Sequence, residues 1–259
     1  MIEKMMRKET FKLSVEEEFA ELIMVRPGVL NAANWNWMED LHESLDHIEA
    51  MEGLRVVIVS GEGRSFSTGI DLKSLALGEI KIDWFQSWER AMHRIEMLRP
   101  ITIARMHGYA IGGGLQVALA CDLRVASEDS QMGLPAVLEA LIPGLGTHRL
   151  PRYIGLGRAR RMILTGELVS AREALEIGLV DWVFPDDKIA QMTRDLAARL
   201  LSGSKTAQHF SKMLTNIAFD KDVIDACKVY LDYQAQTISS SEHRSAMENY
   251  RRLKGLDAQ

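Results

Sequence analysis

Hydrophobic residues recur along the chain in two patterns, one typical of strands and the other of helices. Short runs rich in β-branched residues, at 54–59 and 101–106, are bounded by turn-forming residues and predict strands buried on both faces. Between such runs, apolar residues are spaced three and four positions apart, as in amphipathic helices. Strands separated by helices continue to Phe184, and helical segments alone follow. This order predicts an α/β protein with a parallel sheet and a helical C-terminal part.

Turn and loop residues refine this outline. Residues 10–25 predict a hairpin around an acidic turn that lacks the usual Asn-Gly or Asp-Gly pair. Residues 147–164 form a basic amphipathic stretch, which we expect to be a solvated face. The best hinge is the Ser-Gly-Ser segment at 202–204. We therefore expect a core domain of residues 1–201 and a C-terminal helical region of residues 202–259.

Two helices are expected in the first half of the core. Asn34 is a suitable cap for a helix that extends to about residue 51, and residues 83–98 carry a stripe of tryptophan and methionine at helical spacing. Such a stripe is typical of a core, although this helix lies between two glycine-containing loops and can also face a ligand. In the first helix, His42 and His47 are five positions apart and cannot share the face that a zinc site requires, so we expect both to be solvated.

A run of three glycines dominates the candidate chemistry. It lies at Gly112–Gly114 in the segment HGYAIGGGLQVALACD (107–122), directly after a predicted strand and before a helical pattern. Glycine is costly to order and weakens helices, so its use here indicates backbone that closely approaches another group. The first turn of a helix also offers unpaired N–H groups. The segment predicts either a backbone cradle for an anion or oxyanion, or tight packing of helix on strand.

Composition limits the function classes. The chain has 259 residues, 47% of them hydrophobic and 26% charged, with a net charge of −5. This charge provides no basic surface for nucleic acid, and no apolar run is long enough to cross a membrane. Cys121 and Cys227 fit no metal or disulfide pattern and are expected to be buried free thiols. Without a leader pattern at the N-terminus, we expect a cytoplasmic protein with no metal site.

Several segments together resemble the crotonase (enoyl-CoA hydratase/isomerase) superfamily, and the resemblance covers essentially the whole chain. The segments that carry it are Arg26-Pro27, GEGRSFSTGIDLK at 61–73, the triple-glycine segment, LPAVLEALIPGLGTHRLP at 134–151 and Leu164-Thr165-Gly166. The resemblance implies a crotonase-like spiral of repeated ββα units with a C-terminal helical trimerisation region. It also implies a coenzyme A thioester as substrate, no tightly bound cofactor, and a homotrimer or a hexamer built as a dimer of trimers.

The resemblance assigns roles to individual residues. It places the thioester oxygen between the backbone amides of Ile70 and Gly113, where two fixed donors would stabilise an enolate. Lys73 is matched to a basic residue near the CoA phosphates, and Tyr250 is placed to meet a CoA held by another subunit. The remaining substrate-binding positions that the resemblance implies are Ser67, Thr68, Asp71, Leu72, Gly112 and Ala136.

Two positions depart from the hydratases of this family. Gln116 and Ala136 stand where those enzymes have the two glutamates that hold and activate water. Glutamine can position water but cannot accept a proton at neutral pH, and alanine can do neither. Glu139 follows Ala136 by about one helical turn, so it is a candidate base, and a solvated glutamate is the alternative. Isomerisation, thioester hydrolysis and decarboxylation suit these residues better than standard hydration.

Three functions remain open from the sequence. The first is an acyl-CoA enzyme of the hydratase/isomerase type, and the second is a pseudoenzyme that binds acyl-CoA without turnover. The third is a serine hydrolase with Ser65 or Ser67 as nucleophile and His107 or His148 as base, although SxSxG differs from the GxSxG nucleophile turn. Apolar residues within 222–253 exceed what this short region can bury, so we expect self-association through the C-terminal helices.

Overall fold

The computed structural model describes residues 4–256, and its contacts divide the chain into two compact units, residues 1–197 and 198–259. Helix α8 (Ile189–Leu201) spans this division. The boundary expected at residue 201 therefore coincides with the end of α8, four residues beyond the division in the contacts.

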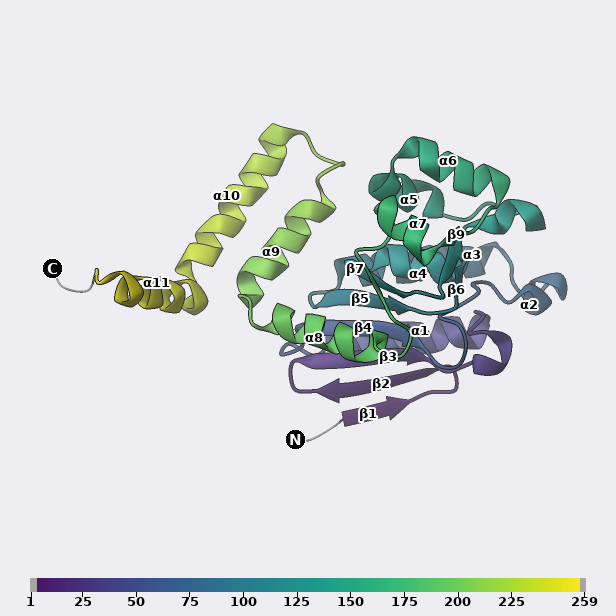
Figure 1. Cartoon of the computed structure of the whole chain (residues 1–259), viewed down its shortest axis with the longest axis horizontal. Helices are drawn as coiled ribbons and strands as arrows, with labels where there is room; N and C mark the ends of the chain where they lie inside the picture. The colour runs from purple at the N-terminus through teal and green to yellow at the C-terminus, as the bar shows by residue number, and fades with distance from the viewer. Residues whose placement is uncertain (1–3, 257–259) are drawn as a thin grey trace. The chain divides into compact units, whose positions relative to one another are not determined.

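The first unit is built on a seven-stranded sheet (Figure 1). The second strand is antiparallel to both the first and the third, whereas the pairings from the third strand onward are parallel. The expected parallel sheet is thus a mixed one, and the sequence pattern missed its first edge strand. In order across the sheet the strands are β1 (Lys4–Arg7), β2 (Phe11–Glu16), β3 (Phe19–Met24), β4 (Val56–Gly61), β5 (Ile101–Met106), β7 (Leu123–Ser127) and β10 (Trp182–Phe184).

The predicted hairpin is present as β2 and β3, paired from Phe11 with Met24 to Glu16 with Phe19. Glu17 adopts a positive φ of 52° in the turn, the left-handed conformation that Asn or Gly would normally supply. A non-glycine residue therefore forms a tight turn here at some conformational cost.

A second, three-stranded sheet lies beyond the first and consists of β6 (Tyr109–Ile111), β8 (Gln131–Gly133) and β9 (Val169–Ser170). β6 is parallel to β8, and β9 is antiparallel to it. β6 continues from β5 after only two residues, so the chain passes from the large sheet to the small one just before the triple glycine. This passage brings the glycine turn against loop 61–71, where Ser67 forms an isolated bridge with Ala110.

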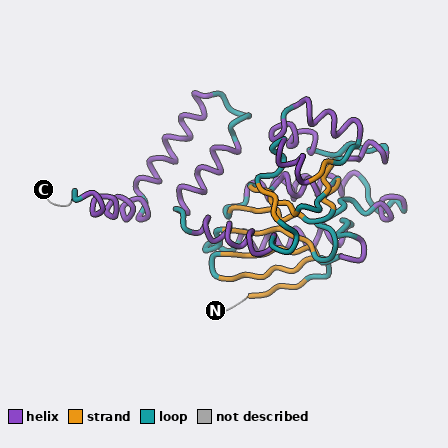
Figure 2. Tube along the Cα trace, in the orientation of Figure 1, coloured by secondary structure: helices purple, strands orange, loops and turns teal. Residues whose placement is uncertain are grey.

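Helices cover the sheets of the first unit (Figure 2). Asn34 caps α1 (Trp35–Glu49) by accepting a hydrogen bond from the Trp37 amide at 3.1 Å, as predicted. Trp37 stacks on Trp88 of α3 (Ile82–Met97), with ring centroids 5.4 Å apart, so the tryptophan stripe belongs to the core. The helices are η1 (Pro27–Val29), α1 (Trp35–Glu49), α2 (Leu72–Ala76), α3 (Ile82–Met97), α4 (Gly113–Ala120), η2 (Pro135–Glu139), α5 (Gly146–Ile154), α6 (Leu156–Thr165) and α7 (Ala171–Glu176).

The expected exposure is wrong for three residues, Arg149, His42 and Cys227. The basic stretch 147–164 is two helices separated at Gly155, and Arg149 within it is buried because it pairs with two glutamates. His42 is half-buried and hydrogen-bonded to Ser87 at 2.9 Å. Burial, followed by the nearby positive charge of Arg94, lowers the pKa of His42. Of the two cysteines, Cys121 is buried but Cys227 is exposed.

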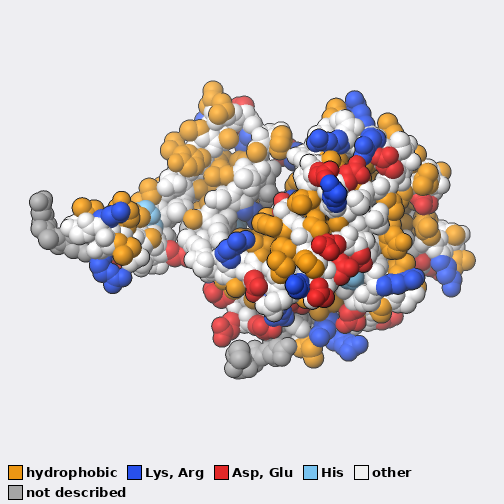
Figure 3. Space-filling model, viewed as in Figure 1, with side chains coloured by type: hydrophobic (Ala, Val, Ile, Leu, Met, Phe, Trp, Pro, Cys, Tyr) orange, Lys and Arg blue, Asp and Glu red, His pale blue; other side chains and the backbone are white. Residues whose placement is uncertain are grey.

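The second unit consists of α9 (Lys205–Asn216), α10 (Val223–Ser239) and α11 (Ser241–Lys254). Phe210 stacks on Tyr233 at 4.4 Å between ring centroids and joins α9 to α10. Neither α10 nor α11 contains a buried residue, and Figure 3 shows apolar side chains on the surface around α9 and α10. Within residues 4–256, no helix is both long and apolar enough to cross a lipid bilayer.

Glu242 of α11 holds the start of α9. Its carboxylate accepts hydrogen bonds from the Ser204 hydroxyl at 2.8 Å and from the Lys205 and Thr206 amides at 3.0 Å. Burial opposes ionisation, but these hydrogen bonds outweigh it and lower the pKa of Glu242 from 4.5 to about 2. A carboxylate at a helix N-terminus is also favoured by the helix dipole.

We expect Glu242→Gln to loosen the junction of α9 and α11. Because the folded pKa lies below the unfolded one, the stabilisation by Glu242 is complete above pH 4.5 and is lost as the pH falls toward 2. The difference in thermal stability between wild type and variant, measured by circular dichroism, should be largest near neutrality and should shrink through this range. A difference that is independent of pH would contradict the role assigned to this carboxylate.

Candidate active site

The first unit contains a cavity of about 100 Å³ that collects side chains from four segments. They are loop 68–72, helix α3, the triple glycine with the start of α4, and residues 135–144. Most of the lining is apolar or backbone, and the exceptions with polar side chains are Thr68, Glu89, Gln116 and Glu139. An apolar cavity with a few convergent polar groups is typical of a ligand site.

Asn31 holds loop 61–71 in place. Its side-chain amide donates to three carbonyl oxygens within residues 62–66 at 2.9 to 3.1 Å. The hydroxyl of Ser67 is buried, donates to the Asn31 carbonyl at 2.9 Å and accepts the Gly69 amide at 3.1 Å. Ser67 therefore shapes the loop and does not line the cavity.

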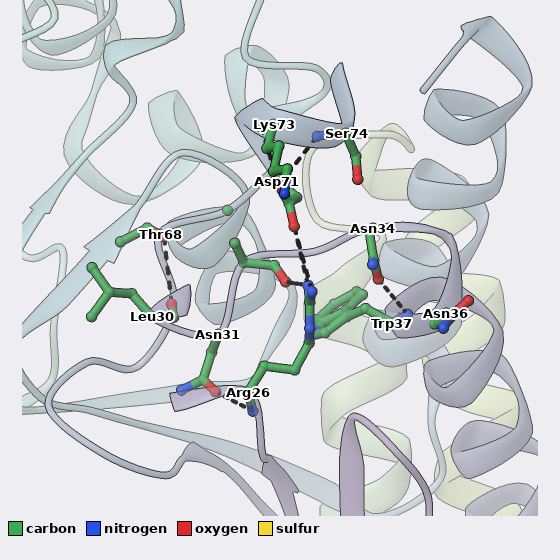
Figure 4. A network of polar contacts seen from close by, with 12 residues as sticks. Arg26, Leu30, Asn31, Asn34, Asn36, Trp37, Thr68, Asp71, Lys73 and Ser74 are labelled. Atoms are coloured by element: carbon green, nitrogen blue, oxygen red, sulfur yellow. Dashed lines mark hydrogen bonds and ion pairs between the residues drawn. The ribbon is translucent and has the colours of Figure 1, made fainter. Parts of the chain in front are cut away.

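Asp71 fixes the other side of this loop (Figure 4). Its carboxylate caps α2 by accepting the amides of Lys73 and Ser74 at 3.1 and 3.3 Å, and it pairs with Arg26 at 3.4 Å. The Lys73 side chain is exposed and outside the cavity lining. Asp71 thus orders the backbone directly after Ile70.

The backbone amides of Ile70 and Gly113 lie on neighbouring walls of the cavity. Ile70 forms a parallel bridge with Ala33. In this bridge the Ala33 amide donates to the Gly69 carbonyl, and the Asp71 amide donates to the Ala33 carbonyl. The bridge therefore does not use the Ile70 amide. Gly113 opens α4, where the first N–H groups have no partner within the helix. In residues 4–256 neither amide has a hydrogen-bond acceptor. Two free donors therefore border one cavity.

The glycines bring these two segments together. A Cβ on Gly69, whose φ is +84°, would lie 2.4 Å from the Gly113 nitrogen, far inside van der Waals contact. A Cβ on Gly113 would lie 2.9 Å from the Trp88 ring and 3.0 Å from the Gly69 Cα. The glycines therefore allow close backbone contact, which supports tight packing, one of the two explanations for the triple glycine.

The residues at the hydratase positions also line the cavity. Gln116 is buried, and its Oε1 atom has no hydrogen-bond partner. Ala136 and Glu139 are three residues apart on η2, and because a 3-10 helix has three residues per turn they share one face. Glu139 is exposed to solvent at the edge of the cavity. Glu139 therefore has the position expected of a candidate base, and its carboxylate is open to water.

Sequence reasoning missed Glu89, which α3 contributes to the cavity. Its Oε1 accepts the Leu145 amide at 2.8 Å, and its Oε2 accepts Arg149 at 2.8 Å. The sequence did contain an indication of this position. Glu89 is four residues after Phe85, on the same face of the helix, and Phe85 also lines the cavity. Burial opposes the charge of Arg149, but hydrogen bonds to Glu96 and Glu89 outweigh it and raise the pKa of Arg149.

Among the described residues, the serine–histidine hydrogen bonds that a serine hydrolase requires are not formed. The Ser65 hydroxyl donates to the Tyr109 carbonyl at 2.9 Å, and the Ser67 hydroxyl bonds to backbone. His107 contacts the Gly63 carbonyl at 3.0 Å, and His148 is exposed. Within the described residues neither serine is hydrogen-bonded to a histidine, so no activated nucleophile is formed.

The remaining predicted site residues divide into two groups. Thr68, Leu72 and Gly112 line the cavity with the residues already described. Tyr250 belongs to the second unit, where it is exposed. Among residues 4–256, no group of three or more His, Cys, Asp or Glu side chains is arranged to hold a metal ion.

Comparisons with known proteins agree on one family. Residues 14–254 match the family model described as enoyl-CoA hydratase/isomerase. A short-chain-enoyl-CoA hydratase of Clostridium acetobutylicum is 30% identical over 251 residues, which cover 94% of this chain and 96% of that protein.

Solved structures give the same result for the fold. An enoyl-CoA hydratase of Geobacillus kaustophilus HTA426 superposes with a TM-score of 0.92 at 28% identity and covers 96% of each chain. A Thermobifida fusca YX protein solved with acetoacetyl-CoA has a TM-score of 0.82 at 26% identity, covering 89% of this chain and 95% of that one. These similarities confirm the predicted crotonase-like spiral.

Proposed function

Because this chain belongs to the enoyl-CoA hydratase/isomerase family and is an enzyme acting on acyl-CoA thioesters, we propose that its chemistry depends on an oxyanion hole formed by Ile70 and Gly113. In this proposal the thioester oxygen accepts hydrogen bonds from both backbone amides. The observation that carries it is the pair of unpartnered amides bordering one cavity. Fixed backbone donors stabilise the negative charge of an enolate without reorganising during the reaction.

The proposed reaction is proton transfer next to the thioester rather than standard two-glutamate hydration. Gln116 carries no titratable group and Ala136 has no polar side chain, so neither can exchange the proton. Glu139 shares the face of Ala136 and contacts the same cavity, which makes it the proposed base. It would take a proton from the α or γ carbon of the acyl chain and return it at the other position, which shifts the double bond.

The experiment that tests this function is a turnover screen with 2-enoyl- and 3-enoyl-CoA thioesters of short chain length. Double-bond migration, followed by ultraviolet absorbance and by chromatography of the products, is the expected result. Tight acyl-CoA binding with no turnover of any thioester would identify the protein as a binding protein without catalysis. The absence of both binding and turnover would refute the function.

The proposed placement of coenzyme A follows the cavity edge. Thr68, Leu72 and Gly112 would contact the pantetheine arm near the thioester, and the exposed ammonium of Lys73 would meet the phosphates. Tyr250 is proposed to contact a CoA held by a neighbouring subunit.

We expect the protein to self-associate through its C-terminal helices into a trimer or a dimer of trimers. Val223, Leu231 and Leu253 are 81%, 59% and 73% exposed in the single chain, and burying such side chains in an interface stabilises it. Light scattering coupled to size-exclusion chromatography should give three or six times the monomer mass at micromolar concentration. A monomer under these conditions would contradict the proposed assembly.

A further inference from the structure

Arg26 joins two segments that are distant in the sequence and adjacent in the fold (Figure 4). Its guanidinium donates to the Ala32 carbonyl and lies 3.4 and 3.5 Å, from its two terminal nitrogens, from one oxygen of the Asp71 carboxylate. The Arg26 and Asp71 side chains are only 20% and 15% exposed. Because little water screens this pair, the attraction is stronger than between two charges on the surface.

The two segments fix the peptide group between Gly69 and Ile70. The Ala33 amide donates to the Gly69 carbonyl at 2.7 Å, and the Asp71 amide donates to the Ala33 carbonyl at 2.8 Å. A trans peptide is planar with its N–H opposite its carbonyl, so holding the Gly69 oxygen also aims the Ile70 N–H. Arg26 contacts the residue before Ala33 and the side chain of Asp71, and it does so from outside the cavity lining.

The turn that leads from Arg26 into this pairing is strained. Leu30 and Asn31 are consecutive residues with φ of 54° and 56°, in the left-handed region that leucine rarely adopts. Two hydrogen bonds hold the turn: the Arg26 amide donates to Asn31 Oδ1 at 2.8 Å, and the Thr68 amide donates to the Leu30 carbonyl at 3.1 Å. Strained backbone persists only where the surrounding contacts hold it, and it is concentrated at functional sites.

We propose that Arg26 is a positioning residue for the reaction, which acts through Asp71 and residues 32–33 to aim the Ile70 amide at the thioester oxygen. An oxyanion hole depends on donors that are fixed before the reaction begins, and a displacement of about 1 Å can cost about 10²-fold in rate. This inference rests on the proposed function. It adds a residue outside the cavity lining whose loss should weaken transition-state stabilisation more than substrate binding.

Substitution of Arg26 separates these two effects. Arg26→Gln removes the charge, and we expect kcat for double-bond migration in a 3-enoyl-CoA to fall about tenfold or more, with the Kd of butyryl-CoA changed less than about threefold. Arg26→Lys keeps the charge but not the planar fork, so it should recover part of the lost kcat. Steady-state kinetics and isothermal titration calorimetry measure the two quantities. A loss of affinity with unchanged kcat would overturn the inference.

A double-mutant cycle tests whether Arg26 acts through Asp71. Asp71→Asn keeps an oxygen that can cap α2 but removes the charge that pairs with Arg26. We expect each single variant to lose kcat by a similar factor and the double variant to lose little more, because both changes remove one interaction. Losses that multiply in the double variant would mean that the two side chains act independently, which contradicts the proposal.

Arg94→Gln is the matched control for a loss of stability. The Arg94 side chain is also 20% exposed and pairs with Asp46 and Glu49, but it does not line the cavity. Both arginine variants should lower the melting temperature measured by circular dichroism, whereas only Arg26→Gln should lower kcat. Wild-type kcat in Arg26→Gln would overturn the inference and leave the proposed function intact. Absence of turnover in wild type would instead refute the proposed function.

Discussion

Replacing Gly113 by valine is expected to reduce kcat/KM by at least about 10²–10³-fold, which corresponds to about 2.7–4 kcal/mol of lost transition-state stabilisation. The first side-chain carbon would lie 2.9 Å from the Trp88 ring and 3.0 Å from the Gly69 Cα, so the backbone must shift. The shift displaces the Gly113 amide from the proposed oxyanion position. Gly113 lines the cavity, so the added valine side chain should also lower the affinity for acyl-CoA. Steady-state kinetics and calorimetry measure the two losses.

The same substitution at Gly157 provides a control. Gly157 lies in α6, and a Cβ there would meet nothing within 4 Å. We expect Gly157→Val to keep full activity with at most a small change in melting temperature. Normal activity in Gly113→Val would mean that the Gly113 amide is not part of the oxyanion hole.

Glu139→Gln is expected to reduce kcat by about 10²–10⁴-fold while acyl-CoA affinity remains nearly unchanged. Glutamine has the same shape and polarity as glutamate but cannot accept a proton at neutral pH. The loss should therefore be confined to the transition state, which separates kcat from ligand affinity. Stopped-flow kinetics and calorimetry on the same preparation measure both quantities.

Glu128→Gln is the matched control for this change, because Glu128 is also exposed but lies outside the cavity lining. It should retain wild-type turnover. If Glu139→Gln also retained wild-type turnover, Glu139 would have no part in the mechanism.

Local sequence patterns were sufficient for the elements that carry the site. The triple glycine stands out because three consecutive glycines between a strand and a helix have few explanations, and the close contacts around them match one of these, tight packing. The helix cap at Asn34 and the hairpin at β2 and β3 also follow from short-range rules. The family resemblance added the pairing of Ile70 with Gly113, which no local rule provides.

Side-chain partners that are far apart in the sequence could not be predicted from local patterns. Arg149 was expected on a solvated face, but its partners Glu89 and Glu96 lie more than fifty positions earlier, and together they allow the charge to be buried. Glu89 was overlooked for the same reason, since a single glutamate beside an apolar stripe usually faces solvent. Ser67 was assigned to the substrate, whereas its hydroxyl is used by the backbone of Asn31 and Gly69.

The most direct test of the central claim is the infrared carbonyl frequency of an acyl-CoA bound to the enzyme. Butyryl-CoA carrying ¹³C at the thioester carbonyl gives an isotope-edited difference spectrum that isolates this bond. If the carbonyl oxygen accepts hydrogen bonds from Ile70 and Gly113, its stretching frequency should fall on binding to wild type, because two donors polarise the bond. A bound thioester whose carbonyl frequency equals that in water would contradict the proposed oxyanion hole.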